Sequence, residues 1–334
     1  MKASAPLKYL FPGWFASVMG LGGLALAWHR AAPVMGEAAA WVAAALAALA
    51  AGVFGLLAAA AALRWQRHPE AWAEDLRHPV RHTFVAALPI SLLLLATAAT
   101  ALGLHQGAAG LVVLWCWRIG ALWQLATTVW VLGRWWRGAS AGGLTWAGVT
   151  PALFIPIVGN VLVPLAGLPL GQADWSAAQF GVGLLFWPVV LVLLATRLVV
   201  QGPWPERLRP TAFIVVAPPA VVGLALLQWQ APMPWVWMCW GMAGFSALWA
   251  GTLFMGIAAM PFGMPHWGLS FPLAALTALT LRLATPGPMQ ALAVALLALV
   301  SWLVAWLALA TLRGLRDGSL LAPEPVATLT PTVP

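Results

Sequence analysis

The stretch TPALFIPIVGNVLVPLAG, residues 150–167, has no charged residue and is long enough, at about 20 residues per span, to cross a bilayer. It is interrupted by Pro151, Pro156 and Pro164, with Gly159 and Asn160 at its centre. An internal proline removes a hydrogen bond and costs roughly 3 kcal/mol in a water-soluble helix. In hydrocarbon, neighbouring helices or a wet cavity must satisfy the freed carbonyls. The stretch therefore predicts a broken helix inside a bundle, facing a path rather than lipid.

The composition places the whole chain in a membrane. Hydrophobic residues make up 63% of the 334 and charged residues 7%, against about 25% charged in soluble proteins. The net charge of +8 comes from basic residues scattered through short loops, a pattern that sets topology and argues against nucleic acid as a partner. Cys116 and Cys239 fall in apolar runs, so we expect no disulfide, no metal site and no cofactor.

Apolar windows predict an all-α fold with ten spans in a membrane domain of residues 1–317. The spans are 9–28, 38–63, 84–103, 108–133, 149–167, 177–200, 211–229, 234–258, 266–284 and 289–312. The segment 64–82 has mixed charges and suits a solvated connector or a short surface helix. Residues 318–334, rich in Pro and Thr, are expected to be disordered.

The basic residues predict the orientation. Thirteen of the sixteen Lys and Arg residues lie on the side where the first span starts, and only Arg30 and Arg282 lie on the other. The positive-inside rule then places both termini in the cytoplasm.

Prolines sort the spans into two sets. The odd-numbered spans contain Pro12, Pro89, Pro151, Pro156, Pro164, Pro218, Pro219 and Pro272, whereas only Pro188 lies inside an even-numbered span. Irregular backbone at membrane depth is expected where it lines a cavity. The pattern favours five helical hairpins, with broken odd helices inside and regular even helices outside.

Five stretches make the chain resemble a known family. They are FPGWFASVMGLGGLALAW (11–28), HPVRHTFVAALPI (78–90), residues 150–167, RPTAFIVVAPPAVVGLA (209–225) and PFGMPHWGLSFPLAAL (261–276). They are similar to bacterial tellurite-resistance proteins and plant slow anion channels, a voltage-dependent anion channel family that includes C4-dicarboxylate and sulfite transporters. The resemblance implies ten helices around one central pore per subunit, a homotrimer, and a phenylalanine plug that corresponds to Phe271.

Phe271 has two interpretations. Its apolar surroundings are those of a packed core ring, whereas the resemblance and the adjacent Pro272 favour a gate. A ring that changes rotamer can open or close a narrow hydrophobic constriction.

The predicted spans contain no Asp or Glu. Proton-coupled carriers usually need an intramembrane carboxylate or histidine relay, so this absence favours passive conduction. Breaks near Pro89, Pro156 and Pro218 are expected to present helix N-terminal amides, each helix start carrying roughly half a positive charge, to a passing anion.

Other candidate residues have structural alternatives. Arg118, inside the fourth span, is either an anion contact or, as we favour, a donor to carbonyls at a helix or subunit interface. Asn160 is expected to bond carbonyls freed by Pro164 rather than substrate. Gly13, Gly20 and Gly159 are expected to permit close backbone approach at the pore wall, and Phe154 to line it.

The sequence thus predicts a multi-pass inner-membrane anion channel, not an enzyme, passing chloride or nitrate through a phenylalanine-gated pore. The alternative is a secondary transporter that exports C4-dicarboxylate, sulfite or tellurite. An intramembrane enzyme lacks support because no paired histidines or intramembrane carboxylate is present to act as a base.

Overall fold

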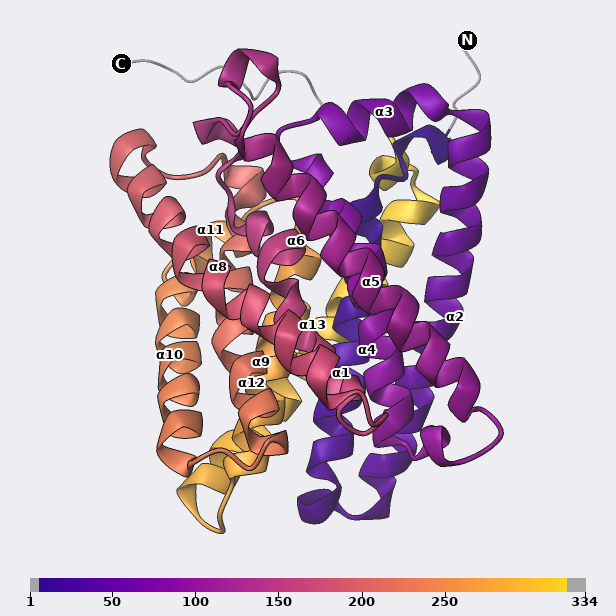
Figure 1. Ribbon diagram of the computed structural model, residues 1–334, viewed down its shortest axis with the longest axis vertical. Helices are drawn as coiled ribbons and strands as arrows, with labels where there is room; N and C mark the ends of the chain where they lie inside the picture. The colour runs from indigo at the N-terminus through magenta and orange to yellow at the C-terminus, as the bar shows by residue number, and fades with distance from the viewer. Residues whose placement is uncertain (1–5, 323–334) are drawn as a thin grey trace.

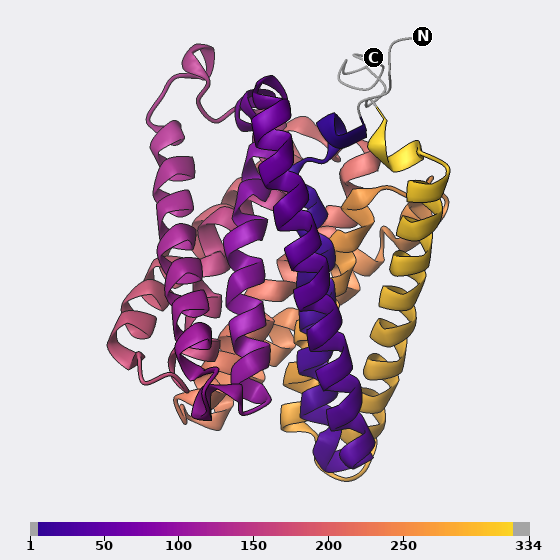
Figure 2. The same cartoon turned by 90° about the vertical axis from the view of Figure 1, so that its right-hand side faces the viewer.

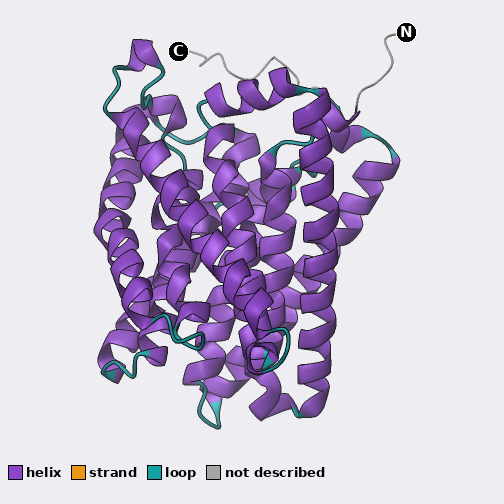
Figure 3. Ribbon diagram, turned by 45° about the vertical axis from the view of Figure 1, so that its right-hand side comes forward, coloured by secondary structure: helices purple, strands orange, loops and turns teal. Residues whose placement is uncertain are grey.

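The computed structural model describes residues 6–322, which form helices and loops and contain no strand (Figures 1 and 3). The α-helices are α1 (Ala16–Met35), α2 (Glu37–Arg67), α3 (Pro69–Arg77), α4 (Ala87–Ala101), α5 (Gly110–Trp135), α6 (Phe154–Val158), α7 (Val163–Gly167), α8 (Ala173–Gln201), α9 (Ala217–Gln228), α10 (Met233–Gly251), α11 (Phe254–Ala258), α12 (Ser270–Leu283) and α13 (Pro288–Arg316). The 3-10 segments are η1 (Pro6–Tyr9), η2 (Pro12–Phe15), η3 (Arg81–Ala86), η4 (Leu104–Gln106), η5 (Ala139–Ala141), η6 (Trp146–Gly148), η7 (Pro151–Leu153), η8 (Gly159–Leu162), η9 (Glu206–Val216), η10 (Met264–Leu269) and η11 (Ser319–Leu321).

Six helical segments of the described chain are long and apolar enough to cross a membrane. They are 37–67, 81–101, 110–135, 173–201, 206–228 and 288–316. The other four predicted spans coincide with helical segments that are shorter or less apolar. The chain is therefore an all-helical, multi-pass membrane protein.

Burial separates the six segments into two groups. The apolar windows of 81–101, which contains Pro89, and of 206–228, which contains Pro210, Pro218 and Pro219, are 78% buried, whereas those of α2, α5, α8 and α13 are 17–39% buried. The first group lies inside the bundle, and the second presents apolar side chains outward, as helices do that face lipid.

Contacts between elements describe a closed arrangement. Each inner segment packs on the helix that follows it: α1 on α2, α4 on α5, α6 and α7 on α8, α9 on α10, and α12 on α13. Contacts also run from α1 to α4, α4 to α7, α7 to α9, α9 to α12, and back to α1. The two ends of the described chain meet at one end of the bundle, where η1 contacts η11 (Figures 1 and 2).

Each inner segment begins as a 3-10 turn and continues as an α-helix: η2 with α1, η3 with α4, η7 with α6, η9 with α9 and η10 with α12. Proline explains the change from 3-10 to α-helix in three of them. Pro89, Pro218 and Pro272 stand second or third in α4, α9 and α12, where a missing N–H is tolerated. A carbonyl four residues before a proline loses its α-helical donor. The Ile214 carbonyl, four residues before Pro218, instead accepts from Ala217, three residues on. The local sequence thereby imposes the tighter turn.

Most of the tail predicted to be disordered lies outside the described residues, namely 323–334. Within the described part, Ser319–Leu321 form the 3-10 turn that contacts η1.

Candidate functional site

The centre of the bundle contains a narrow apolar cavity of about 40 Å³, to which all five inner segments contribute. It is lined by Met19, Ile90, Phe154, Ile155, Val158, Gly159, Val161, Leu162, Ile214, Ala217, Pro218, Val221 and Phe271. About 10–15 Å³ of such volume is enough for one water molecule, so the cavity has room for only a few. The structure thus brings together four predicted site residues, Phe154, Gly159, Pro218 and Phe271.

The remaining predicted residues of the inner segments are buried but do not line this cavity. They are Pro12, Gly13, Gly20, Pro89, Pro156, Asn160 and Pro272. Gly20 lies against α12, where an added methyl group would collide with the Ser270 hydroxyl. The close approach at Gly20 is therefore between two inner helices. At Gly159 an added methyl would lie 2.7 Å from Ile90 Cδ1, and this approach is at the cavity wall.

Phe271 stands at the second position of α12 and is 7% exposed. Its ring lies against the backbone of α1, because a methyl group added at Gly23 would be 3.0 Å from Phe271 Cδ2 and 3.1 Å from Ala274 Cβ. The ring therefore borders the cavity on one side and packs on the other against the α1 backbone at Gly23, where no side chain intervenes.

The expectation that the breaks present free helix amides is wrong at the three places where it was made. Ala87 N–H donates to Phe84, Ala217 N–H donates to Ile214, and Phe154 N–H donates to Pro151 and Ala152. The 3-10 turns use the amides that a sharp helix start would leave unpaired.

The carbonyls around Pro156 are satisfied by side chains of the neighbouring outer helix. Gln124 Nε2 of α5 donates to the Ile155 and Pro156 carbonyls, at 3.0 Å each. Thr128 Oγ1, one turn later, donates to the Pro156 carbonyl at 2.6 Å. Gln124 is fully buried and Thr128 nearly so. The broken helix is thus held by α5, as a proline at membrane depth requires.

Asn160 extends these contacts to a second outer helix. Its Nδ2 donates to Thr128 Oγ1 at 2.8 Å and to the Ile157 carbonyl at 2.9 Å, so the carbonyl it bonds precedes it and is not one freed by Pro164. Its Oδ1 accepts from Gln179 Nε2 of α8 at 2.8 Å, and Gln179 Oε1 accepts from Trp175 Nε1. We call Gln124, Thr128, Asn160 and Gln179 the amide network.

Sequence reasoning missed three members of the amide network, Gln124, Thr128 and Gln179. A usable signal was present for the two glutamines, because a side-chain amide in an apolar span must find a partner or lose several kcal/mol. Their shared target, the break in residues 150–167, is visible only in three dimensions.

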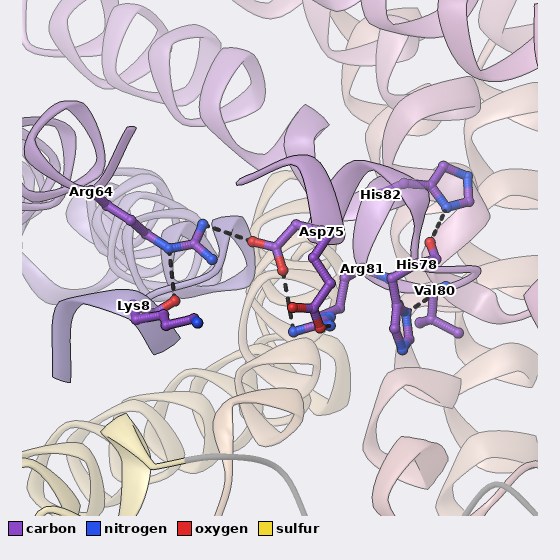
Figure 4. A network of polar contacts seen from close by, with 8 residues as sticks. Lys8, Arg64, Asp75, His78, Val80, Arg81 and His82 are labelled. Carbon is purple, nitrogen blue, oxygen red and sulfur yellow. Dashed lines mark hydrogen bonds and ion pairs between the residues drawn. The ribbon is translucent and has the colours of Figure 1, made fainter. Parts of the chain in front are cut away.

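A second polar constellation lies at the terminal end of the bundle, in the connector 64–82 (Figure 4). Arg64 Nη1 lies 2.7 Å from Asp75 Oδ2, and Arg81 Nη1 lies 3.2 Å from Asp75 Oδ1. Arg81 also pairs with the exposed Glu74 at 2.6 Å, and Arg64 Nε donates to the Lys8 carbonyl at 2.9 Å. We call Arg64, Glu74, Asp75 and Arg81 the ion-pair cluster. It fastens α2, the short helix α3 and η1 to the start of η3.

Asp75 is the buried centre of this cluster. It is 0% exposed and Arg64 is 2% exposed. Burial raises the pKa of the Asp75 carboxyl, while the guanidiniums of Arg64 and Arg81 act to lower that pKa. The predicted connector therefore contains a short surface helix, and one of its ion pairs, Arg64 with Asp75, is buried.

Arg118 lies on the outer helix α5 and is not among the residues that line the cavity. Its guanidinium carbon is 5.2 Å from the centre of the Trp115 ring. Among the described residues no carboxylate pairs with it and no carbonyl accepts from it. This position does not match an anion contact in the pore or a donor to carbonyls of another helix in the described chain, whereas donation at a subunit interface stays a prediction.

The described residues contain no group of three or more His, Cys, Asp and Glu side chains placed to hold a metal ion. The chemistry that the cavity offers is that of an apolar constriction without ionisable lining.

Comparison with known proteins agrees with this geometry. The chain is 24% identical over 298 residues to an uncharacterized transporter of Methanocaldococcus jannaschii, covering 81% of this chain and 83% of that protein. It is 26% identical to a tellurite resistance protein TehA homolog of Haemophilus influenzae, covering 79% of this chain and 78% of that one.

The S-type anion channel SLAH2 of Arabidopsis thaliana is 27% identical over 219 residues, which are 64% of this chain and 40% of the plant protein. The family described as voltage-dependent anion channel matches residues 9–312, nearly the whole described chain. The chain therefore belongs to the voltage-dependent anion channel family.

Proposed function

We propose that the chain is a channel for small monovalent anions such as chloride and nitrate, built from ten membrane spans in five hairpins. The observation that carries the proposal is the central cavity: one residue set from all five inner segments encloses it, and no ionisable side chain lines it. A lining without strong binding groups lets an ion leave as readily as it enters, which conduction requires.

The direction of the inner segments favours anions. Each hairpin returns the chain to the end where the termini meet, so the five inner segments run parallel to one another. Parallel helix dipoles place their positive ends on one side. Most of the basic residues lie on that same side in the ten-span topology. An anion approaching this mouth meets positive potential from both sources.

Phe271 is the proposed gate. Its ring narrows the cavity, and the bare backbone at Gly23 supports it from behind. Pro272 fixes the local backbone so that the ring is directed inward. A change of rotamer is sufficient to widen an apolar constriction of this size.

Current through purified protein in planar bilayers tests the gate. Phe271→Ala removes the ring, and we expect anion current per folded protein to rise steeply with unchanged selectivity, with Phe271→Leu between the two. Phe180→Ala is the matched control, because Phe180 is a buried ring on the outer helix α8, against Trp229. A core role for Phe271 would instead give both Ala variants unchanged current and a stability loss of about 3–5 kcal/mol.

The second candidate is a secondary transporter of C4-dicarboxylate, sulfite or tellurite. The archaeal relative is named a transporter and the Haemophilus influenzae relative a tellurite resistance protein, which supports transport and tellurite but neither of the other two substrates. Flux that follows a proton gradient and stays far below channel rates identifies this alternative. Reversal potentials in mixed-anion solutions identify the preferred ion.

The proposal includes a homotrimer with one pore in each subunit, in an inner membrane, with both termini cytoplasmic. The contact between η1 and η11 supports termini on one side. Reporter fusions at the two termini and in α3 test the orientation, and a mass measurement in detergent tests the trimer. A reporter showing the C-terminus outside, or a stable monomer, contradicts the respective part.

A further inference from the structure

An open apolar groove on the outer surface lies beside the unpaired Arg118. It has a volume of about 400 Å³ and is lined by Leu92 of α4 and by Leu111, Val112, Trp115, Cys116 and Ile119 of α5. Val112 is 70% exposed and Ile119 is 51% exposed. The groove is separate from the central cavity and opens sideways from the bundle, where the lipid of a multi-pass protein lies.

Arg118 lies at the edge of this groove, one turn after Trp115. A helical side chain leans toward the N-terminus of its helix, and the position of the guanidinium over Trp115 shows that Arg118 does so. The N-terminus of α5 is the end nearer to Arg118 and to the membrane surface. The charged group therefore extends toward the headgroups, as snorkelling arginines do.

The depth of Arg118 suits this interpretation. It stands eight residues after Gly110, about 12 Å along the helix. With 26 residues, α5 is about 39 Å long, roughly 9 Å more than the hydrocarbon core of a bilayer. If the excess is shared between the ends, the Arg118 backbone lies about 7 Å inside the hydrocarbon edge. An arginine extended along the helix brings its guanidinium from there to the edge of the hydrocarbon, next to the headgroup region.

The partner of Arg118 must supply an acceptor with negative charge. In a second copy of this chain, the carboxylates at this end of the bundle are Glu37 and Asp174, each in the first turn of its helix, and none lies within a predicted span. A phospholipid offers a phosphate at the headgroup level and an acyl chain for the apolar groove. We propose that Arg118 and this groove form a binding site for an acidic phospholipid, with the phosphate on the guanidinium and the acyl chain between α4 and α5. This inference does not depend on the proposed channel function.

Lipid retention, measured by native mass spectrometry of the purified full chain, tests the site. The probes are phosphatidylglycerol and phosphatidylcholine with identical acyl chains, together with inorganic phosphate. We expect the chain to hold phosphatidylglycerol about fivefold more tightly than phosphatidylcholine, the factor equivalent to the ~1 kcal/mol contributed by a basic residue at an acidic membrane surface. Inorganic phosphate alone is expected to leave no adduct.

Three variants complete the test. Arg118→Gln removes the charge and is expected to abolish the preference for phosphatidylglycerol. Arg282→Gln, an exposed arginine at the same end of the bundle, is the control and is expected to keep it. Val112→Trp fills the groove from an exposed position and is expected to weaken retention of both lipids with Arg118 intact.

Two results overturn the proposal. One is phosphatidylglycerol retention by Arg118→Gln and Val112→Trp equal to that of the unmodified chain. The other is an assembly of copies that Arg118→Gln dissociates while lipid retention stays unchanged, which would make the occupant a second copy. Should Arg118→Gln fail to fold, Val112→Trp alone tests whether lipid occupies the groove, because this substitution changes only the apolar surface. Unchanged lipid retention by Val112→Trp would then overturn the proposal.

Discussion

The amide network and the ion-pair cluster both bury polar atoms where two outer elements meet an inner segment, but they use different chemistry. At membrane depth, Gln124, Asn160 and Gln179 are neutral and bond carbonyls and one another. At the terminal end, Arg64 and Asp75 carry full charges. An isolated charge in hydrocarbon costs several kcal/mol, whereas a neutral amide costs less, even at Gln124, where Nε2 donates to two carbonyls and the buried Oε1 has no partner. The comparison indicates that depth in the membrane decides whether neutral or charged side chains hold neighbouring elements together.

The largest expected effect is at the centre of the ion-pair cluster. Asp75→Asn leaves the buried Arg64 guanidinium without a counter-charge, and breaking a buried pair in this way costs about 3–5 kcal/mol. Thermal unfolding in detergent measures the loss. Glu74→Gln is the control, because Glu74 is the adjacent residue of the same helix, pairs with Arg81 and is exposed. Equal melting temperatures for the two variants would mean that the buried charge does not stabilise the connector.

A smaller effect is expected in the amide network. Gln124→Leu keeps the volume but removes the side-chain donor of the Ile155 carbonyl, and an unsatisfied buried acceptor costs about 1–3 kcal/mol. The Pro156 carbonyl keeps Thr128 as a donor. Gln172→Leu is the control, since Gln172 is half-buried and its bond to Leu170 is long, at 3.4 Å. The interpretation fails if both variants unfold at the same temperature.

Removing the hydroxyl from Thr128 is expected to have a weaker effect still. In Thr128→Val the Pro156 carbonyl keeps Gln124, and Asn160 keeps the Ile157 carbonyl, so the cost is about 1 kcal/mol. The double variant with Gln124→Leu leaves the Pro156 carbonyl without either side-chain donor. Its loss should therefore exceed the sum of the single losses, and a double-mutant cycle measures this coupling. Strict additivity would show that the two side chains act separately.

The sequence predicts the irregular start of the buried segment 206–228 because proline acts locally. A missing N–H at Pro218 forces the 3-10 turn before it wherever the helix lies in the fold. For the same reason the expectation of free amides was wrong, because it treated each proline as a sharp break in the helix. Instead, the carbonyl that loses its α-helical donor accepts from the N–H three residues later, as Ile214 accepts from Ala217.

The cavity lining was predicted only in part, for a different physical reason. Met19 and Ile90 line the cavity, yet their apolar side chains in an apolar span are indistinguishable from core residues by sequence. Phe271 was singled out by family resemblance, and its role as a gate stays a prediction. The pairing of Asp75 with Arg64 was equally hidden, because mixed charges in a loop usually lie in solvent.

The smallest expected effect distinguishes the exposed from the buried carboxylates of α3 by pH. Glu70 is exposed and pairs with Lys8 at 3.7 Å. A backbone hydrogen bond, chiefly, and the neighbouring Lys8 and His68 lower the pKa of the Glu70 carboxyl. A lowered pKa contributes stability that is present above the ordinary Glu pKa of about 4.3 and is lost as pH falls through the folded value.

Asp75 has the opposite sign, because its pKa is raised and the folded chain therefore takes up that proton more readily than the unfolded chain. Melting temperatures compared between pH 7 and a pH well below the lowered pKa of Glu70 should show Glu70→Gln indistinguishable from the unmodified chain at the acidic pH and only slightly less stable at pH 7, since exposed ion pairs contribute little. A loss at neutral pH as large as that of Asp75→Asn would show that burial does not separate these two carboxylates.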